Sequence, residues 1–206
     1  AIGFRLRGDS SGTESVITTT TTNGAWHNIV AIRDYNSGSP QLKLYIDKVA
    51  VTPVTDSTSG DFDSYDKFSI CNDNYSGGRY WFDGNTSNVA IFNSALTEDQ
   101  IATIYNSGAP NDISSLSPVG WWSLAGDSYY NGNDWICPDL SSNSNNGTSD
   151  AMGGTELVGD GPGSTANGIA TSMNIPGNLK GNAPNSSKNA FSVNMTAIDR
   201  VEDVPA

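Results

Sequence analysis

Three stretches decide the fold: WHNIVAIRD at residues 26–34, LKLYID at 42–47 and NVAIFNSALTEDQIATIYNSG at 88–108. Apolar residues alternate with other residues along the first two stretches and the start of the third, as in a strand that buries one face. Turn-forming clusters, NSGSP at 36–40 and NYSGG at 74–78, punctuate the chain between them. The pattern predicts several antiparallel strands joined by polar turns, which is typical of a β-sandwich.

One short helix is expected after the last of these strands. Thr97 and Gln100 have the spacing of a capping box, in which each side chain accepts from the backbone N–H of the other residue. Three apolar residues then share one helix face, which we expect to pack on the sheet: Ile101, Ile104 and Tyr105. Gly108, followed by a proline, should end the helix.

In order and spacing, the three stretches resemble the second half of a laminin-G-like or concanavalin A-like lectin domain. In that family a strand that begins with Trp-His runs antiparallel to a strand reading LYxDG, and a VAIFNxALT strand leads into a closing helix. The resemblance covers residues 1–110 and implies an all-β, antiparallel jelly-roll-type sandwich. A complete domain has several earlier strands, so this one is expected to be incomplete at its N-terminus. Lys48 replaces the family's turn glycine, and Ser87 with Asn88 replaces an acidic pair.

Charge and composition limit the partners. The formal net charge is −12 at pH 7, which repels phosphate backbones, so we expect no binding to nucleic acid. No apolar run approaches the length of a membrane span, so no membrane insertion is expected. The abundance of Gly, Ser, Asn and Thr is typical of β proteins at an extracellular or virion surface. Cys71 and Cys137 form either one disulfide or, in the preferred interpretation, two free buried thiols.

The last third of the chain, residues 146–206, repeats itself with a period of about 22 residues. The segments NGTSDAM, NGIATSM and NAFSVNM end at Met152, Met173 and Met195. Such a repeat predicts a β-rich C-terminal arm of three strand-and-turn units, each burying its apolar residue on a neighbour. The alternative is a disordered tail of biased composition.

Residues 111–145 form a linker and a strand that resemble the start of a further domain. Both faces of residues 119–124 carry bulky side chains, including Trp121 and Trp122. A strand that is apolar on both faces needs cover on both, so we expect burial in the sandwich or against another subunit. These two tryptophans and the three repeat methionines are therefore the candidate assembly residues.

No enzyme is expected. Glucanases with a concanavalin-like fold need two carboxylates across a cleft and carry two Glu and an Asp on one strand, in the pattern ExDxxE. The four glutamates of this chain form no such array: Glu14, Glu98, Glu156 and Glu202. Neither a GxSxG elbow nor a GxxxxGK loop occurs.

Two kinds of binding residue remain. Carboxylates suited to calcium lie in an acidic loop and its neighbours, although a solvated loop is the preferred interpretation: Asp61, Asp63, Asp66, Asp73 and Asp83. Two aromatic clusters could stack on sugars, or could equally be core residues or interface anchors: Tyr75, Tyr80 and Trp81, and then Tyr129, Tyr130 and Trp135.

The leading hypothesis is a non-enzymatic structural component of a phage virion or extracellular assembly that mediates subunit association or surface attachment. An acidic sandwich followed by short repeats resembles marine bacteriophage virion proteins that carry laminin-G-like domains. The expected partners are other copies of the chain or other virion proteins. The alternative is a glycan-binding module that recognises cell-surface glycan, with calcium as the one cofactor to consider.

Overall fold

The computed structural model describes residues 1–7, 14–21, 24–35, 38–58, 67–73, 80–82, 84–124, 126–150, 152–158, 161–162, 172–174, 178–182 and 190–198. Its elements are, in chain order, β1 (Ile2–Arg7), β2 (Glu14–Thr19), β3 (Trp26–Asp34), β4 (Gln41–Ile46), β5 (Val49–Ala50), β6 (Val54–Thr55), β7 (Lys67–Ile70), β8 (Asn72–Asp73), β9 (Tyr80–Trp81), β10 (Asn85–Phe92), α1 (Glu98–Tyr105), η1 (Asn106–Gly108), η2 (Ser114–Leu116), β11 (Gly120–Trp122), β12 (Tyr129–Tyr130), β13 (Trp135–Cys137), β14 (Gly147–Asp150), β15 (Leu157–Val158), β16 (Ser172–Asn174), β17 (Asn178–Asn182) and β18 (Ala190–Ile198).

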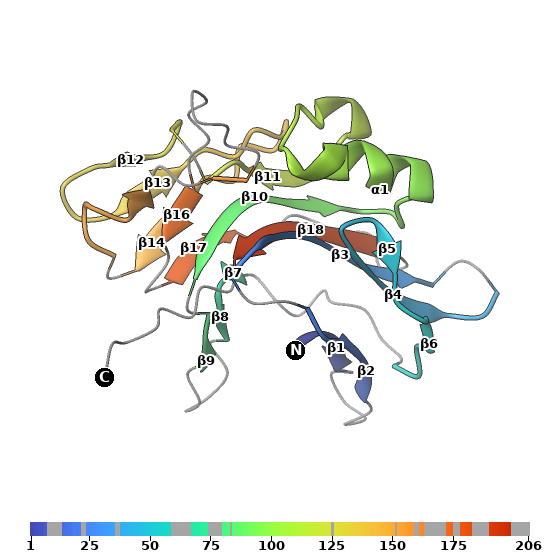
Figure 1. The fold of residues 1–206 in the computed structure, drawn as a ribbon. Coiled ribbons are helices and arrows are strands. Elements are labelled where there is room, and N and C mark those ends of the chain that lie inside the picture. The colour runs from blue at the N-terminus through green and yellow to red at the C-terminus, as the bar shows by residue number, and fades with distance from the viewer. Residues whose placement is uncertain are drawn as a thin grey trace.

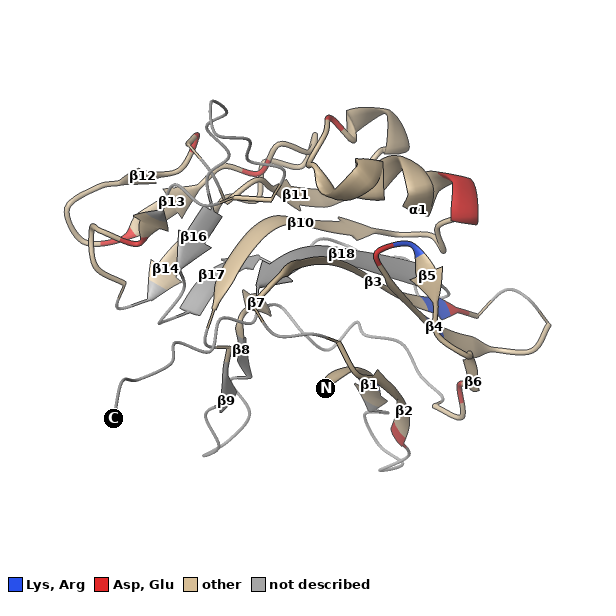
Figure 2. Cartoon of the chain, in the orientation of Figure 1, with Lys and Arg blue, Asp and Glu red and all other residues tan. Residues whose placement is uncertain are grey.

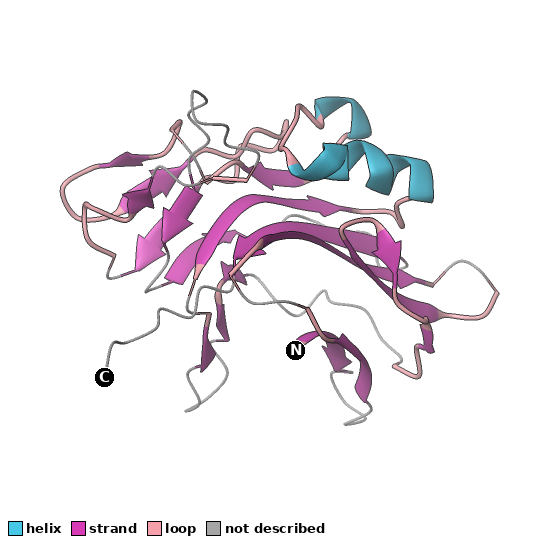
Figure 3. Ribbon diagram, in the orientation of Figure 1, coloured by secondary structure: helices cyan, strands magenta, loops and turns pink. Residues whose placement is uncertain are grey.

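Two larger antiparallel sheets make up the fold (Figure 1). The first has the order β15-β16-β10-β18-β3-β4-β5, with β11 also pairing with β10 and β6 with β4. The second has the order β12-β13-β14-β17-β7. The hairpins β1-β2 and β8-β9 are separate two-stranded sheets. The predicted all-β sandwich with one short helix is confirmed; Figure 3 shows α1 on one side of the strands.

One face of the first sheet is covered by strands. The row Leu44–Ala31–Val193–Ile91 crosses four paired strands and therefore shares this face. At the β4 end of the row, the β1-β2 hairpin packs Leu6 and Ile17 against β4. At the β10 end the same face packs against residues of the second sheet: Ile70, Trp135 and Cys137.

The opposite face carries the helix. Val30, Ala90 and Phe92 pack against α1, whose Ile101 and Ile104 are buried as predicted. The predicted capping box is present, with Thr97 accepting from the backbone of Gln100 and the Gln100 side chain accepting from the backbone of Thr97. The helix ends at Tyr105, three residues before the Gly108 that was expected to end it, because Asn106 adopts a left-handed conformation with φ 41°.

The strand of residues 120–122 confirms the expectation of burial on both faces. β11 pairs with β10, and Trp122 is 1% exposed on the face toward the second sheet. Trp121 packs on the helix side. Gly120 leaves room for the neighbouring indole, because a Cβ there would lie 2.5 Å from the Trp122 ring. This chain therefore supplies the cover for both tryptophans itself.

The strands described after residue 146 pair with the sandwich. β16 and β18 both pair with β10, and β17 pairs with β7. β18 also runs beside all nine residues of β3, from Trp26 to Asp34. The predicted β-rich arm is thus folded into the two sheets where it is described. The proposed segment boundaries at residues 110 and 145 stay predictions.

Both departures from the lectin-like sequence pattern lie at special backbone positions. Asn88 has φ 50° at a bulge in β10, where its amide oxygen accepts from Nε1 of Trp121 at 3.3 Å. Asparagine tolerates this conformation better than most residues. Asp47 and Lys48, with φ 50° and 62°, form the two-residue turn between β4 and β5. Such a turn needs positive φ at both positions and favours glycine at the second.

Lys48→Gly should therefore raise the free energy of unfolding by about 1 kcal/mol relative to Lys48→Ala. Both variants lose the contact of the Lys48 ammonium with the Tyr105 ring, which lies 5.9 Å away, so only backbone strain differs between them. Urea titration followed by tryptophan fluorescence measures the difference. An alanine variant as stable as the glycine variant would contradict a strained turn.

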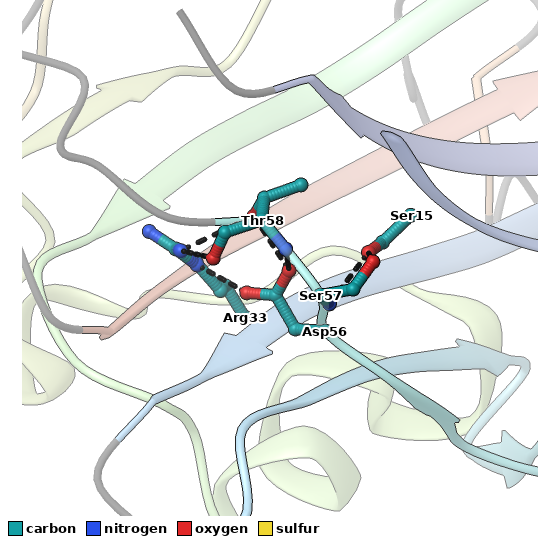
Figure 4. A network of polar contacts seen from close by, with 5 residues as sticks. All are labelled: Ser15, Arg33, Asp56, Ser57 and Thr58. Atoms are coloured by element: carbon teal, nitrogen blue, oxygen red, sulfur yellow. Dashed lines mark hydrogen bonds and ion pairs between the residues drawn. The ribbon is translucent and has the colours of Figure 1, made fainter. Parts of the chain in front are cut away.

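A buried ion pair fastens the segment after β6 to β3 (Figure 4). Nε of Arg33 donates to Oδ2 of Asp56 at 2.7 Å, and both side chains are almost fully buried. Thr58 donates its backbone N–H and its hydroxyl to the other carboxylate oxygen and accepts from the guanidinium. The next contact, from Ser57 to Ser15, reaches the β1-β2 hairpin. Every charge in this network therefore has a partner.

Burial raises the pKa of Asp56, but the hydrogen bonds from Thr58 and Arg33 outweigh it and lower the pKa below its usual value. The stabilisation from a lowered pKa is complete above the unfolded value of about 3.9 and is lost as pH falls through the folded value.

Asp56→Asn should lower the free energy of unfolding by about 3–5 kcal/mol at pH 7, because Arg33 is left buried without its counter-charge. The difference from wild type should shrink between pH 5 and pH 2 in urea titrations. A pH-independent difference would contradict this assignment.

Candidate functional site

The candidate calcium ligands lie mostly outside the described residues. This is true of Asp61, Asp63, Asp66 and Asp83, while Asp73 is described only as a backbone position in β8. In the described part of the chain, no three His, Cys, Asp or Glu side chains form a group that could hold a metal ion. The calcium site therefore stays a prediction.

Only one of the two aromatic clusters has described side chains. Tyr75 lies outside the described residues, and Tyr80 and Trp81 are described as the backbone of β9. The second cluster lies on the β12-β13 hairpin, at the edge of the second sheet (Figure 1). Asn131 caps the loop of this hairpin, because its side-chain oxygen accepts from the backbone of Asn133 and Asp134 at 2.9 Å. Hydrogen bonds within the loop therefore stabilise the turn between β12 and β13.

Trp135 anchors the hairpin to the core. Its side chain is 5% exposed, and its indole Nε1 donates to the carbonyl of Gly153. Its backbone N–H donates to the Ser149 hydroxyl at 2.9 Å. Trp135, one of the predicted sugar-binding aromatics, is therefore a core residue that supports its exposed neighbours.

Tyr130 packs against the Trp135 side chain. It is paired with Trp135 across the two strands, with ring centroids 5.8 Å apart and planes tilted by 51°. A Cβ atom on Gly154 would lie 3.2 Å from the Tyr130 ring, so this ring also packs against the backbone of Gly154. In spite of these contacts, 39% of Tyr130 stays exposed. Its ring is therefore both positioned and accessible.

A carboxylate borders the same glycine pair. Oε1 of Glu156 lies 3.4 Å from the position of a Cβ on Gly153. We call the surface formed by Tyr130, Gly153, Gly154 and Glu156 the Tyr130 platform. No sequence pattern distinguishes Glu156, because a single glutamate with no motif around it looks like an ordinary surface residue.

Tyr129 points away from this platform. Consecutive strand residues face opposite sides of a sheet, and Tyr129 is paired with Ile136, not with Trp135. It is 56% exposed. The two tyrosines, predicted as one cluster, therefore offer two separate surfaces.

The assembly residues differ in where they lie. Trp122 and Met152 are buried in the core between the two sheets, at 1% and 2% exposure. Trp121 is partly buried and packs against the hydrophobic cluster that includes Ile101 and Ile104 of α1. Met173 and Met195 are described only as backbone positions of β16 and β18. The burial of Trp122 and Met152 is thus internal to this chain.

Asp139 is a second residue with no distinguishing pattern around it in the sequence. Its carboxylate accepts from the backbone N–H groups of Trp121, Ser141 and Asn145 and from the Ser141 hydroxyl. Four donors occupy the two oxygens of this carboxylate. Asp139 therefore fastens β11 to the loop before β14.

A small, partly open hollow lies between the end of α1 and the first sheet. Three asparagines line it together with Tyr105: Asn28, Asn88 and Asn111. Its volume is about 20 Å³, enough for one water molecule but not for a sugar ring. Oδ1 of Asn111 is buried there without a hydrogen-bond partner in the protein, which a water molecule would satisfy.

Cys71 and Cys137 are free thiols, as the preferred interpretation predicted, but only Cys137 is fully buried and Cys71 is partly buried. Both pack in or against the core between the sheets. Burial raises the pKa of each thiol to about 11, although the Thr86 hydroxyl moderates the effect at Cys71. Neither thiol is suited to nucleophilic chemistry, which requires the thiolate.

The folded protein should therefore incorporate almost no Ellman's reagent at pH 8, and two thiols per chain should react after unfolding in guanidinium. The raised pKa leaves on the order of one thiolate in a thousand at this pH, and burial blocks the reagent. Rapid reaction of one equivalent in the native state would show that a thiol is accessible and would contradict this description.

Residues 1–102 match the family model described as the Concanavalin A-like lectin/glucanases superfamily. This part of the chain is thus similar to a lectin/glucanase-like domain, in agreement with the antiparallel sandwich. The matched range ends within α1, and the hairpin with Tyr130 lies beyond it. No match was found among curated proteins or among solved structures. Within the described residues, no helix has the length and apolar character to cross a membrane.

Proposed function

We propose that this protein is a non-enzymatic surface-attachment protein that binds glycan through the Tyr130 platform. The observation that carries the proposal is the state of Tyr130, whose ring is held by Trp135 and Gly154 yet remains 39% exposed. A ring that is already fixed loses little conformational freedom when a ligand packs on it. The apolar C–H face of a pyranose can cover the ring while its hydroxyl groups donate to Glu156.

The environments of the other carboxylates support a binding role over catalysis. Asp56 is paired with Arg33, Asp139 accepts four hydrogen bonds, and Asp47 accepts from His27 and the backbone of Asn28. A glycosidase instead needs two carboxyl groups directed at one bond of its substrate. Each of these three carboxylates is occupied by a structural contact.

Attachment is favoured over subunit association as the role of the predicted residues. Trp122 and Met152 are covered by their own chain, so neither can anchor a neighbour without unfolding part of the core. Virion or extracellular localisation, and calcium as a cofactor, remain proposals that rest on the sequence resemblance. An attachment role at such a surface would make cell-surface glycan the partner.

Tyr130→Ala should weaken glycan binding about tenfold, since a stacked aromatic contact contributes about 1.5 kcal/mol. The matched control is Tyr35→Ala, because Tyr35 is equally exposed, at 38%, and follows β3 in the first sheet, whereas Tyr130 lies in the second. The unfolding midpoints are compared as well, because the Arg33 guanidinium lies 4.6 Å from the centroid of the Tyr35 ring. A glycan array followed by calorimetry on the bound glycans measures both variants. Binding by Tyr130→Ala equal to wild type, or no binding of wild type to any glycan, would overturn the proposal.

Tyr129→Ala is the second comparison. Tyr129 belongs to the same strand but faces the other side of the sheet, so its loss should change affinity less than twofold if the Tyr130 platform is the site. Equal losses in both variants would point to damage of the hairpin, which the far-ultraviolet spectrum and the unfolding midpoint would reveal.

A further inference from the structure

The residues of the Tyr130 platform come from a long stretch of sequence that contains acidic residues and no basic ones. Between residues 80 and 179 the sequence has no Lys, Arg or His. The same stretch holds ten acidic residues: Asp83, Glu98, Asp99, Asp112, Asp127, Asp134, Asp139, Asp150, Glu156 and Asp160. Every residue of the platform belongs to this stretch.

The fold does not bring a described basic side chain to the platform. Figure 2 shows blue residues at β4 and the β4-β5 turn, whereas the β12-β14 end is marked only in red. Lys43 there is already paired with Asp34 at 2.8 Å. The basic residue nearest to β12 along the second sheet is Lys180 in β17, three strands away, or about 14 Å at ordinary strand spacing.

Acidic residues, in contrast, lie close to the hairpin. Asp127 is exposed and lies just before β12, and Asp134 is partly exposed in the loop that joins β12 to β13. Glu156 borders Gly153, next to the glycine on which the Tyr130 ring packs. Glu156 is therefore the carboxylate that the structure places nearest to the platform, with Asp127 and Asp134 in adjoining loops.

We propose that the Tyr130 platform selects its glycan by charge, binding neutral and amino sugars and rejecting sugars that carry carboxylate or sulfate. This inference rests on the proposed glycan-binding function. An exposed carboxylate within a Debye length repels an anionic group, so we expect an anionic sugar to bind about threefold more weakly than a neutral one. An ammonium group experiences the same field with the opposite sign, and Glu156 can accept its hydrogen bonds.

The test uses oligosaccharides that share a backbone and differ in one charged substituent on each sugar ring. β-1,4-linked hexamers of glucose, glucosamine and glucuronic acid, and the corresponding galactose, galactosamine and galacturonic acid hexamers, give neutral, cationic and anionic ligands on two backbones. Wild-type affinity at pH 6 should decrease in the order cationic, neutral, anionic within each backbone series that binds, with about tenfold between the ends. The range should narrow at 0.5 M salt, because screening shortens the reach of exposed charges.

Glu156→Gln locates the effect, with Glu98→Gln as its matched control. Both variants remove one negative charge, but Glu98 lies in the first turn of α1, away from the hairpin. Glu156→Gln should reduce the preference for the cationic over the neutral hexamer by about threefold, and Glu98→Gln should leave it unchanged. Glu156→Gln should weaken binding of the neutral hexamer less than binding of the cationic one, since glutamine retains a carbonyl acceptor but carries no charge.

The outcomes separate the two proposals. Tightest binding of an anionic hexamer, or equal effects of the two glutamate variants, would overturn selection by the platform's charge while leaving glycan binding in place. No binding of any hexamer, together with an empty glycan array, would instead overturn the proposed function and the inference with it.

Discussion

The fold depends on covering β10 from both sides. This strand is buried along almost its whole length, with Val89 and Ile91 on one face and Ala90 and Phe92 on the other. A strand of this kind has no solvated face, so two separate layers must pack against it. The second sheet supplies one layer and α1 the other. Trp121 and Trp122 extend both layers from the neighbouring strand, which explains why adjacent bulky residues occur there.

Local sequence was enough to predict the elements around this strand. Alternation identified β3, β4 and β10, and the pair Thr97 and Gln100 identified the start of the helix, because these signals depend on neighbours in sequence. The pairing partners were harder to predict. Nothing in residues 190–198 indicates that β18 separates β3 from β10, since register is decided by contacts between distant segments.

The candidate site, too, was predictable from local sequence only in part. Composition and turn residues placed Tyr129, Tyr130 and Trp135 on a loop-rich segment, but one sequence cannot tell which aromatic supports and which is exposed. That distinction comes from Ser149 and Gly153, which hold Trp135 in the core from positions 14 and 18 residues later. Gly154 then limits where the Tyr130 ring can lie. The accessible surface is thus a product of tertiary packing, and Glu156 joins it only through the fold.

The place of β18 has a consequence for biosynthesis. β3 and β10 emerge from the ribosome long before residues 190–198, yet each has one of its main-chain partners in that late segment. Until then, two long apolar strands have unpaired edges, which are prone to non-native association. The central sheet can close only when translation has delivered β18. Cotranslational docking of the early strands with each other would have to be undone, so this architecture favours folding after synthesis, at the slow pace of long-range β pairing.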